Sequence, residues 1–75
     1  MPRLTPQPYK DLIRVFSKAG FTISRQQGSH IVMNRPRTDR PIVIPKYKEV
    51  GVSIIKSCLR TAGMDREEYF RLLVD

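Results

Sequence analysis

The residue best suited to proton transfer in this sequence is His30, the only histidine of the chain, which directly follows a Gly-Ser step. Imidazole exchanges a proton near neutral pH more readily than other side chains, so it often serves as a general acid or base. The alternation after His30 puts Ile31 and Met33 on the core side of a strand and His30 on the outer side. Val32 shares that outer side, so spacing alone does not separate a catalytic histidine from an ordinary surface histidine.

The other side chains that carry chemistry lack the partners they would need. Ser29 and Cys58 are the candidate nucleophiles, but neither has a second histidine or a positioned acid to complete a triad. One histidine, one cysteine in a helical apolar stripe and scattered carboxylates provide no cluster of metal ligands. The sequence therefore predicts no metal site, no cofactor and no covalent catalysis.

Basic residues form two stripes on predicted helices. Lys10, Arg14 and Lys18 are spaced i, i+4, i+8, and Lys56 and Arg60 are spaced i, i+4. Like charges stacked on one helix face destabilise it by roughly a few tenths of a kcal/mol per pair. A polyanion alongside would relieve this repulsion, although long side chains that splay into water would do so as well.

A further group of basic residues surrounds the predicted strands: Arg25, Arg35, Arg37, Arg40, Lys46 and Lys48. Guanidinium groups on the proline-bounded loop of residues 35–41 can bond phosphate oxygens in pairs, although a solvated loop tip would have the same composition. Tyr47 is the only aromatic residue nearby, so a stacking platform for single-stranded bases is not supported. We expect this loop and the two stripes to flank the strand start that bears His30.

The chain of 75 residues holds 14 Lys and Arg against 7 Asp and Glu, and its net charge is +7. Residues 1–60 hold twelve basic and three acidic side chains, whereas residues 61–75 hold two basic and four acidic ones. A segregated basic region favours a polyanionic partner, either nucleic acid or an acidic protein. A chain this short buries only roughly 60% of its unfolded surface, so the working site should lie on the surface.

A single domain is expected over residues 1–75, with residues 1–7 as a short N-terminal arm. The lone Cys58 cannot form an internal disulfide, and the apolar runs are too short for a membrane span or a signal peptide. We therefore expect a cytoplasmic protein that does not bind membranes.

Two main helices are predicted from apolar residues that recur at i, i+3, i+4 and i+7 in residues 9–19 and 52–62. A glycine follows each run, as is common at helix ends. Thr5 is the expected N-cap of the first helix, which would begin at Pro6 or Pro8. Asp65, with a glutamate three positions later, predicts the start of a short third helix.

Three strands are expected at residues 21–25, 30–34 and 42–44, with a turn at residues 27–29. A three-stranded antiparallel sheet this short needs one covered face, so both main helices should pack on the same face. The predicted fold is therefore α+β, with the α-β-β-β-α(-α) order of double-stranded RNA-binding domains.

Four segments, taken in order, match the pattern of a known family: Lys18 to Phe21, Arg25 to His30, Val43 to Gly51, and Ile55 to Gly63. Over about residues 9–73 the sequence resembles the HicA toxins, also described as YcfA-like, of bacterial and archaeal toxin–antitoxin pairs. The Gly-Ser-His step is quite specific in this setting, whereas each of the other pieces alone is weak.

This resemblance implies a double-stranded RNA-binding-like fold and an endoribonuclease that cleaves messenger RNA, with His30 as the catalytic residue. It also implies a HicB-like antitoxin that covers the active surface. Some relatives carry a second histidine after the proline that ends the third strand, where this chain has Tyr47 nearby.

We hypothesise that His30 acts as general acid or base in metal-independent cleavage, in which the neighbouring ribose 2′-hydroxyl attacks phosphorus. Tyr47 or a nearby Lys or Arg would act opposite His30, and Arg25, Lys46 and Lys48 would stabilise the developing charge. The expected RNA contacts are Lys10, Arg14, Arg25, Ser29, Arg35, Arg37, Lys46, Lys48, Lys56 and Arg60.

Two other functions fit the same residues. A non-catalytic RNA-binding module would use the helix stripes to straddle the phosphates of an A-form duplex and would leave the RNA intact. A structural protein whose basic surface meets only an acidic partner would have no affinity for RNA at moderate salt.

Overall fold

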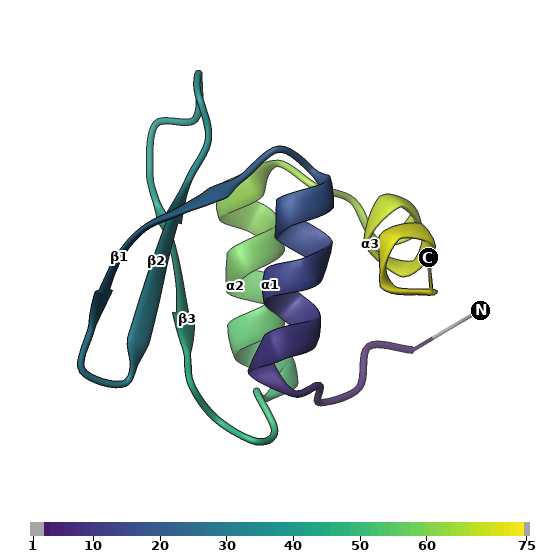
Figure 1. The fold of residues 1–75 in the computed structure, drawn as a ribbon. Helices are drawn as coiled ribbons and strands as arrows, with labels where there is room; N and C mark the ends of the chain where they lie inside the picture. The colour runs from purple at the N-terminus through teal and green to yellow at the C-terminus, as the bar shows by residue number, and fades with distance from the viewer. Residues whose placement is uncertain (1–2, 75) are drawn as a thin grey trace.

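The computed structural model describes residues 3–74, which form an α+β fold of three helices and three strands (Figure 1). The elements are α1 (Tyr9–Lys18), β1 (Thr22–Gln27), β2 (His30–Asn34), β3 (Ile42–Pro45), α2 (Val52–Ala62) and α3 (Arg66–Val74). The predicted order of elements is confirmed. Met1, Pro2 and Asp75 of the expected domain lie outside the described residues.

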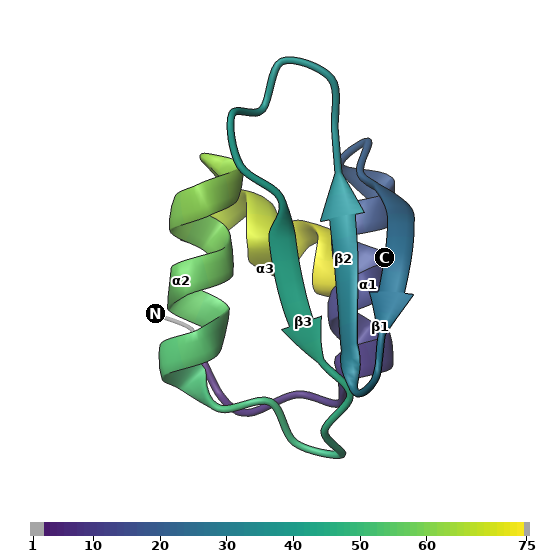
Figure 2. The same ribbon diagram turned by 90° about the vertical axis from the view of Figure 1, so that its left-hand side faces the viewer.

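The strands form one antiparallel sheet with β2 in the middle. Both α1 and α2 lie on one face of this sheet and run in the same direction, as predicted for that face, and α3 packs against α1 on the side away from the sheet (Figures 1 and 2). The other face of the sheet is left open.

The core fills the space between the covered face of the sheet and the helices. Its fully buried aliphatic and phenyl side chains include Leu12, Val15, Phe16, Met33, Ile42, Ile44 and Ile55. Each side chain of this size stabilises the fold by about 1.5–3 kcal/mol when fully buried. These residues recur at the spacing of one helix face or one strand face, so the hydrophobic pattern of the sequence determines how the helix layer packs on the sheet.

Helix α1 begins later than the N-cap predicted at Thr5. Its N-cap is Pro8, and the Thr5 hydroxyl instead accepts a hydrogen bond from the Gln7 side chain at 3.0 Å. The backbone of Gln7 exchanges two hydrogen bonds with Val50, at 3.2 and 2.7 Å. The segment before α1 therefore pairs with the loop before α2, which leaves Pro8, with its fixed φ, to start the helix.

Strand β1 is longer than predicted and contains a β-bulge. Ile23 pairs with Met33 and Arg25 pairs with Val32, which leaves Ser24 as the extra residue. The Ser24 hydroxyl donates a hydrogen bond to the Val32 carbonyl at 3.3 Å. A bulge changes the phase of the side chains that follow it, so the simple alternation expected for this strand was wrong beyond Ile23.

Helix α3 begins at the predicted cap. The Glu68 amide donates a hydrogen bond to Asp65 Oδ1 at 2.8 Å, and Met64 and Tyr69 are both buried on either side of this turn. The cap and the apolar pair together set the angle at which α3 leaves α2.

Replacing Asp65 with alanine is expected to lower the free energy of unfolding by about 1 kcal/mol, because it removes the cap of α3. Urea denaturation followed by circular dichroism measures this loss. Glu67→Ala is the matched control, since it removes a carboxylate from the same helical turn without removing the cap, and it should cost at most about 0.5 kcal/mol. Equal losses in the two variants would show that helix-dipole charge, not the cap, stabilises this end.

Candidate active site

His30 is the first residue of β2 and is exposed, as the sequence predicted. It pairs with Gln27 across a two-residue turn and with Pro45 on the other side. Ile31 is buried in the core, so His30 faces the open side of the sheet. Among the described residues, no hydrogen bond or ion pair occupies the imidazole, which leaves both ring nitrogens available to a ligand.

Gly28 makes the tight turn before His30 possible. Its φ is +56°, a left-handed conformation that two-residue hairpin turns of the primed types require and that glycine adopts without strain. The turn therefore holds the start of β2 at one end of the molecule (Figure 2).

The loop after β3 lies against this turn. The Lys46 amide donates a hydrogen bond to the Ser29 carbonyl at 2.7 Å, which places Lys46 next to the Gly-Ser-His step. The Tyr47 carbonyl accepts a hydrogen bond from the Tyr9 amide at 3.2 Å, and the Tyr47 side chain is half exposed. Lys48 is exposed in the same loop. Backbone hydrogen bonds thus hold the main chain of Lys46 and Tyr47 at the His30 end, and Lys48 follows in the same loop.

The bulge in β1 brings Arg25 onto the open face. Without the extra residue, Arg25 would share the core side with Ile23; with it, Arg25 pairs with Val32, two residues after His30 on the same side of β2. Arg25 and His30 are then diagonal neighbours, a relation in which residues are about 7–8 Å apart, within reach of a long side chain. The sequence named Arg25 as a candidate but gave no reason for this orientation.

The arginine-rich loop does not flank His30, contrary to the sequence-based expectation. This loop follows Asn34 at the far end of β2, about 14 Å from His30 at the usual rise of an antiparallel strand (Figure 2). Antiparallel topology puts successive loops at alternate ends of a sheet, so the predicted strand order already contained this signal. Arg35, Arg37 and Arg40 therefore form a separate group.

Arg35 is bonded within the protein. Its Nη1 donates to the Ala19 carbonyl and its Nη2 to the Ala62 carbonyl, both at 3.0 Å, and its Nε donates to the Thr38 hydroxyl at 3.2 Å. The guanidinium carbon also lies 4.5 Å from the centre of the Phe21 ring. Every guanidinium nitrogen of Arg35 thus has a partner, which the sequence analysis did not foresee.

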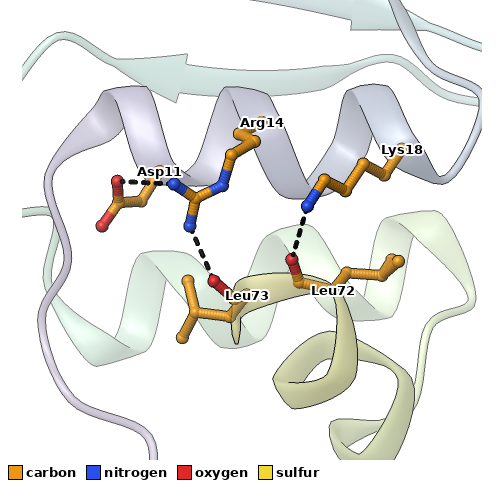
Figure 3. Close-up of polar contacts among 5 residues, drawn as sticks. All are labelled: Asp11, Arg14, Lys18, Leu72 and Leu73. Carbon is orange, nitrogen blue, oxygen red and sulfur yellow. Dashed lines mark hydrogen bonds and ion pairs between the residues drawn. The ribbon is translucent and has the colours of Figure 1, made fainter. Parts of the chain in front are cut away.

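Two residues of the α1 stripe, Arg14 and Lys18, reach the end of α3 (Figure 3). Arg14 Nη2 donates to the Leu73 carbonyl at 2.7 Å, and Lys18 Nζ donates to the Leu72 carbonyl at 3.4 Å. Arg14 Nη1 also lies 3.7 Å from Asp11 Oδ1. Carbonyl groups at the end of α3 and one carboxylate therefore offset part of the repulsion along this stripe.

The remaining predicted contacts are exposed and lie apart from one another. Lys10 is in the first turn of α1, at the His30 end of the molecule, and Lys56 and Arg60 are on α2. Arg60 and Arg37 line one surface hollow beyond the C-terminal end of α2. The structure thus separates the predicted basic residues, with one group near His30, another in the hollow beyond α2, and Lys56 on α2 between them.

The alternative chemistries receive no support from the geometry of residues 3–74. Cys58 is buried, and burial raises the pKa of its thiol to about 11, so little thiolate forms at neutral pH. In this part of the chain no group of three or more His, Cys, Asp or Glu side chains is arranged to hold a metal ion. The described helices include none that is long and apolar enough to cross a membrane.

An α-β-β-β-α-α domain with its helices on one face of the sheet belongs to the double-stranded RNA-binding-like class of α+β folds. Residues 9–64 match the family model described as the HicA toxin of bacterial toxin–antitoxin. This chain belongs to the HicA toxin family, and it is therefore a toxin of a toxin–antitoxin system, in which an antitoxin is its partner. A comparison with curated proteins gave no match.

Replacing Arg35 with methionine is expected to lower the free energy of unfolding by about 2–4 kcal/mol, because two helix-end carbonyls lose a charged donor. Chemical denaturation measures the change. The control is Arg40→Met in the same loop, which should stay within about 0.5 kcal/mol of wild type. If Arg35→Met were as stable as the control, the bonds to Ala19 and Ala62 would not hold the helices in place.

Proposed function

We propose that this toxin is an endoribonuclease that cleaves messenger RNA, with His30 as general acid or base and without a metal ion. The observation that carries the proposal is the exposed His30 on the open face, which has no partner among residues 3–74, with the backbone of Lys46 held beside it by the Ser29 carbonyl. The family match and the Gly-Ser-His step support the same assignment.

In the proposed reaction the nucleophile belongs to the substrate. The 2′-oxygen of the ribose forms a bond to phosphorus while the bond from phosphorus to the 5′-oxygen breaks. His30 accepts the proton of the 2′-hydroxyl, and Tyr47 or a neighbouring lysine donates a proton to the leaving 5′-oxygen. The products are a 2′,3′-cyclic phosphate and a 5′-hydroxyl. No protein nucleophile is needed, which agrees with the burial of Cys58.

Cations around His30 would stabilise the charge that develops on the phosphorane. Arg25 and Lys46 are the nearest by the arguments of register and backbone bonding, and Lys48 follows in the same loop. Donors placed before the reaction are worth more than mobile ones, because they need no reorganisation in the transition state. The backbone of Lys46 is anchored beside His30 by its bond to the Ser29 carbonyl, so we take Lys46 as the first candidate for this charge, ahead of Lys48.

The proposed RNA surface continues outward from this centre. Ser29 and Lys10 lie at the same end of the molecule, Lys56 lies on α2, and Arg37 and Arg60 lie at the far end. We leave Arg14 and Arg35 out of the surface, because their guanidinium groups bond helix-end carbonyls.

A HicB-like antitoxin is the proposed partner that silences the toxin by covering the open face. This face carries Val43, which is 45% exposed, beside buried Val32. The half-exposed Tyr47 lies in the loop after β3, at the His30 end of the sheet. Apolar groups of this kind supply the core of a protein interface, and the surrounding cations supply its polar rim. An antitoxin bound there would exclude RNA from His30. The proposed setting is the cytoplasm, where messenger RNA is translated.

His30→Ala is expected to lower the cleavage rate by about 10²–10⁴-fold, since it removes the general acid or base. The assay uses a labelled RNA in EDTA and compares it with the same strand carrying a single 2′-deoxyribose at the cut site, which should remain intact. The free energy of unfolding of the variant should stay within about 0.5 kcal/mol of wild type, because the exposed imidazole has no partner among the described residues.

Cleavage of the deoxy strand, or full activity of His30→Ala, would contradict the mechanism. RNA binding by both proteins with intact RNA in every lane would instead identify a non-catalytic RNA-binding module.

A further inference from the structure

At the end of the molecule opposite His30, the loop after β2 and the last turn of α2 enclose a surface hollow of about 440 Å³. The lining residues are Arg35, Arg37, Thr38, Asp39, Arg40, Arg60, Thr61, Ala62 and Gly63. We propose that this arginine hollow is a second phosphate-binding site, which holds the RNA backbone away from the cut. The inference rests on the proposed function.

Charge is the first support for the site. Arg37, Arg40 and Arg60 line the hollow with one opposing carboxylate, Asp39. None of these three arginine side chains has a hydrogen bond or an ion pair with another of residues 3–74. Three unpaired guanidinium groups, with two threonine hydroxyls among them, match the oxygens of a phosphodiester.

Arg35 explains why this end of the molecule can attract an anion at all. Two parallel helices end here, and helix ends carry partial negative charge on their carbonyls. Arg35 bonds one carbonyl from each, those of Ala19 and Ala62. The helix ends are thereby satisfied within the protein, and the charges of Arg37, Arg40 and Arg60 remain for a ligand.

The backbone at Arg37 is the second support. Its φ is +71°, and within the described residues it is the one non-glycine residue in the left-handed region. Such a conformation is strained for a non-glycine residue, and residues held in it cluster at active sites, ligand clamps and switch regions. The Thr38 amide donates a hydrogen bond to the Arg35 carbonyl, and Arg35 Nε donates one to the Thr38 hydroxyl, both at 3.2 Å, and these two bonds hold the loop in this shape.

The lining favours RNA over an acidic protein segment. Protein interfaces rely on buried aromatic or aliphatic anchors, and the hollow offers only Ala62, Gly63 and the methyl groups of two threonines. Phosphate contacts need no such anchor. The hollow therefore suits the backbone of a nucleic acid.

Separation from His30 gives the site a measurable consequence. The length of β2, about 14 Å, corresponds to about four stacked nucleotides at 3.4 Å each. A substrate of three nucleotides bound at His30 would not reach the hollow, whereas a strand of twenty would. The site should therefore strengthen the binding of long RNA alone.

The test measures binding of a 20-nucleotide strand with 2′-O-methyl riboses, which cannot be cleaved by attack of the 2′-oxygen, as a function of salt. The variant Arg37→Gly/Arg60→Gln should reduce the slope of log affinity against log salt by about 1.4, the value for two lost phosphate contacts to a single strand. Arg66→Gln/Arg71→Gln is the matched control, since it removes two charges from α3, where Arg71 lies among Asp65, Glu67 and Glu68. The control should keep the wild-type slope.

Glycine at position 37 separates binding from folding. It accepts a φ of +71° without strain, so Arg37→Gly should melt at or above the wild-type temperature while it binds RNA more weakly. The Arg37→Gly/Arg60→Gln variant should raise the KM of the long substrate more than the KM of a trinucleotide, which is too short to reach the hollow from His30.

Equal salt slopes for the Arg37→Gly/Arg60→Gln variant and the control would overturn this inference and leave the proposed cleavage at His30 untouched. Loss of affinity for a polyglutamate peptide, with unchanged affinity for RNA, would overturn it in favour of an acidic protein ligand. A protein that binds no RNA would overturn both the proposed function and this site, whereas binding without cleavage would overturn only the mechanism at His30.

Discussion

One guanidinium group, that of Arg35, joins the layers of this fold at the end opposite His30. It comes from the loop after β2 and bonds the last carbonyls of both α1 and α2, while its flat face covers Phe21. Both helices run in the same direction, so their carbonyl ends gather at one place and need donors that point in several directions. Arginine has five such donors in a rigid plane, whereas lysine has a single ammonium group. The parallel arrangement of α1 and α2 thus explains why arginine suits this position.

The opposite end of the molecule is held by backbone hydrogen bonds and keeps its side chains available. Lys46 bonds Ser29, Tyr9 bonds Tyr47, and Gln7 bonds Val50. Both main helices begin here, and neither has a side chain as its cap. Helix N-termini carry partial positive charge, which adds to the lysines of the loop after β3. The two ends of the sheet therefore differ. At the end opposite His30, side-chain donors bond the carbonyls of the helix ends. The other end presents its cations and His30 to solvent.

Short-range features of the sequence predicted most of the fold and the central residue of the candidate site. Helical and strand periods located the six elements, the Asp65 cap located α3, and alternation gave His30 its exposed side. The errors came from partners far apart in the chain. Thr5 is not the N-cap of α1, because Gln7 pairs with Val50 before the helix begins. Arg25 lies on the open face because of a β-bulge, which no residue type in the sequence indicates. The carbonyl partners of Arg35 lie 16 and 27 positions away, beyond the reach of any local pattern.

A net charge of +7 is therefore not the same as a basic surface. Arg35 donates hydrogen bonds to carbonyls at the ends of α1 and α2, and Arg14 donates one to a carbonyl at the end of α3. Part of the positive charge therefore stabilises the protein itself. Arg14 and Lys18 of the α1 stripe donate to carbonyls of α3 while their side chains stay exposed, so only part of the charge of this stripe is left for a duplex that straddles the two helix stripes. What remains is concentrated at the two ends of β2, around His30 and in the arginine hollow. A strand laid along the sheet would meet both groups of cations, and it would bring its own nucleophile to a domain too small to enclose a pocket.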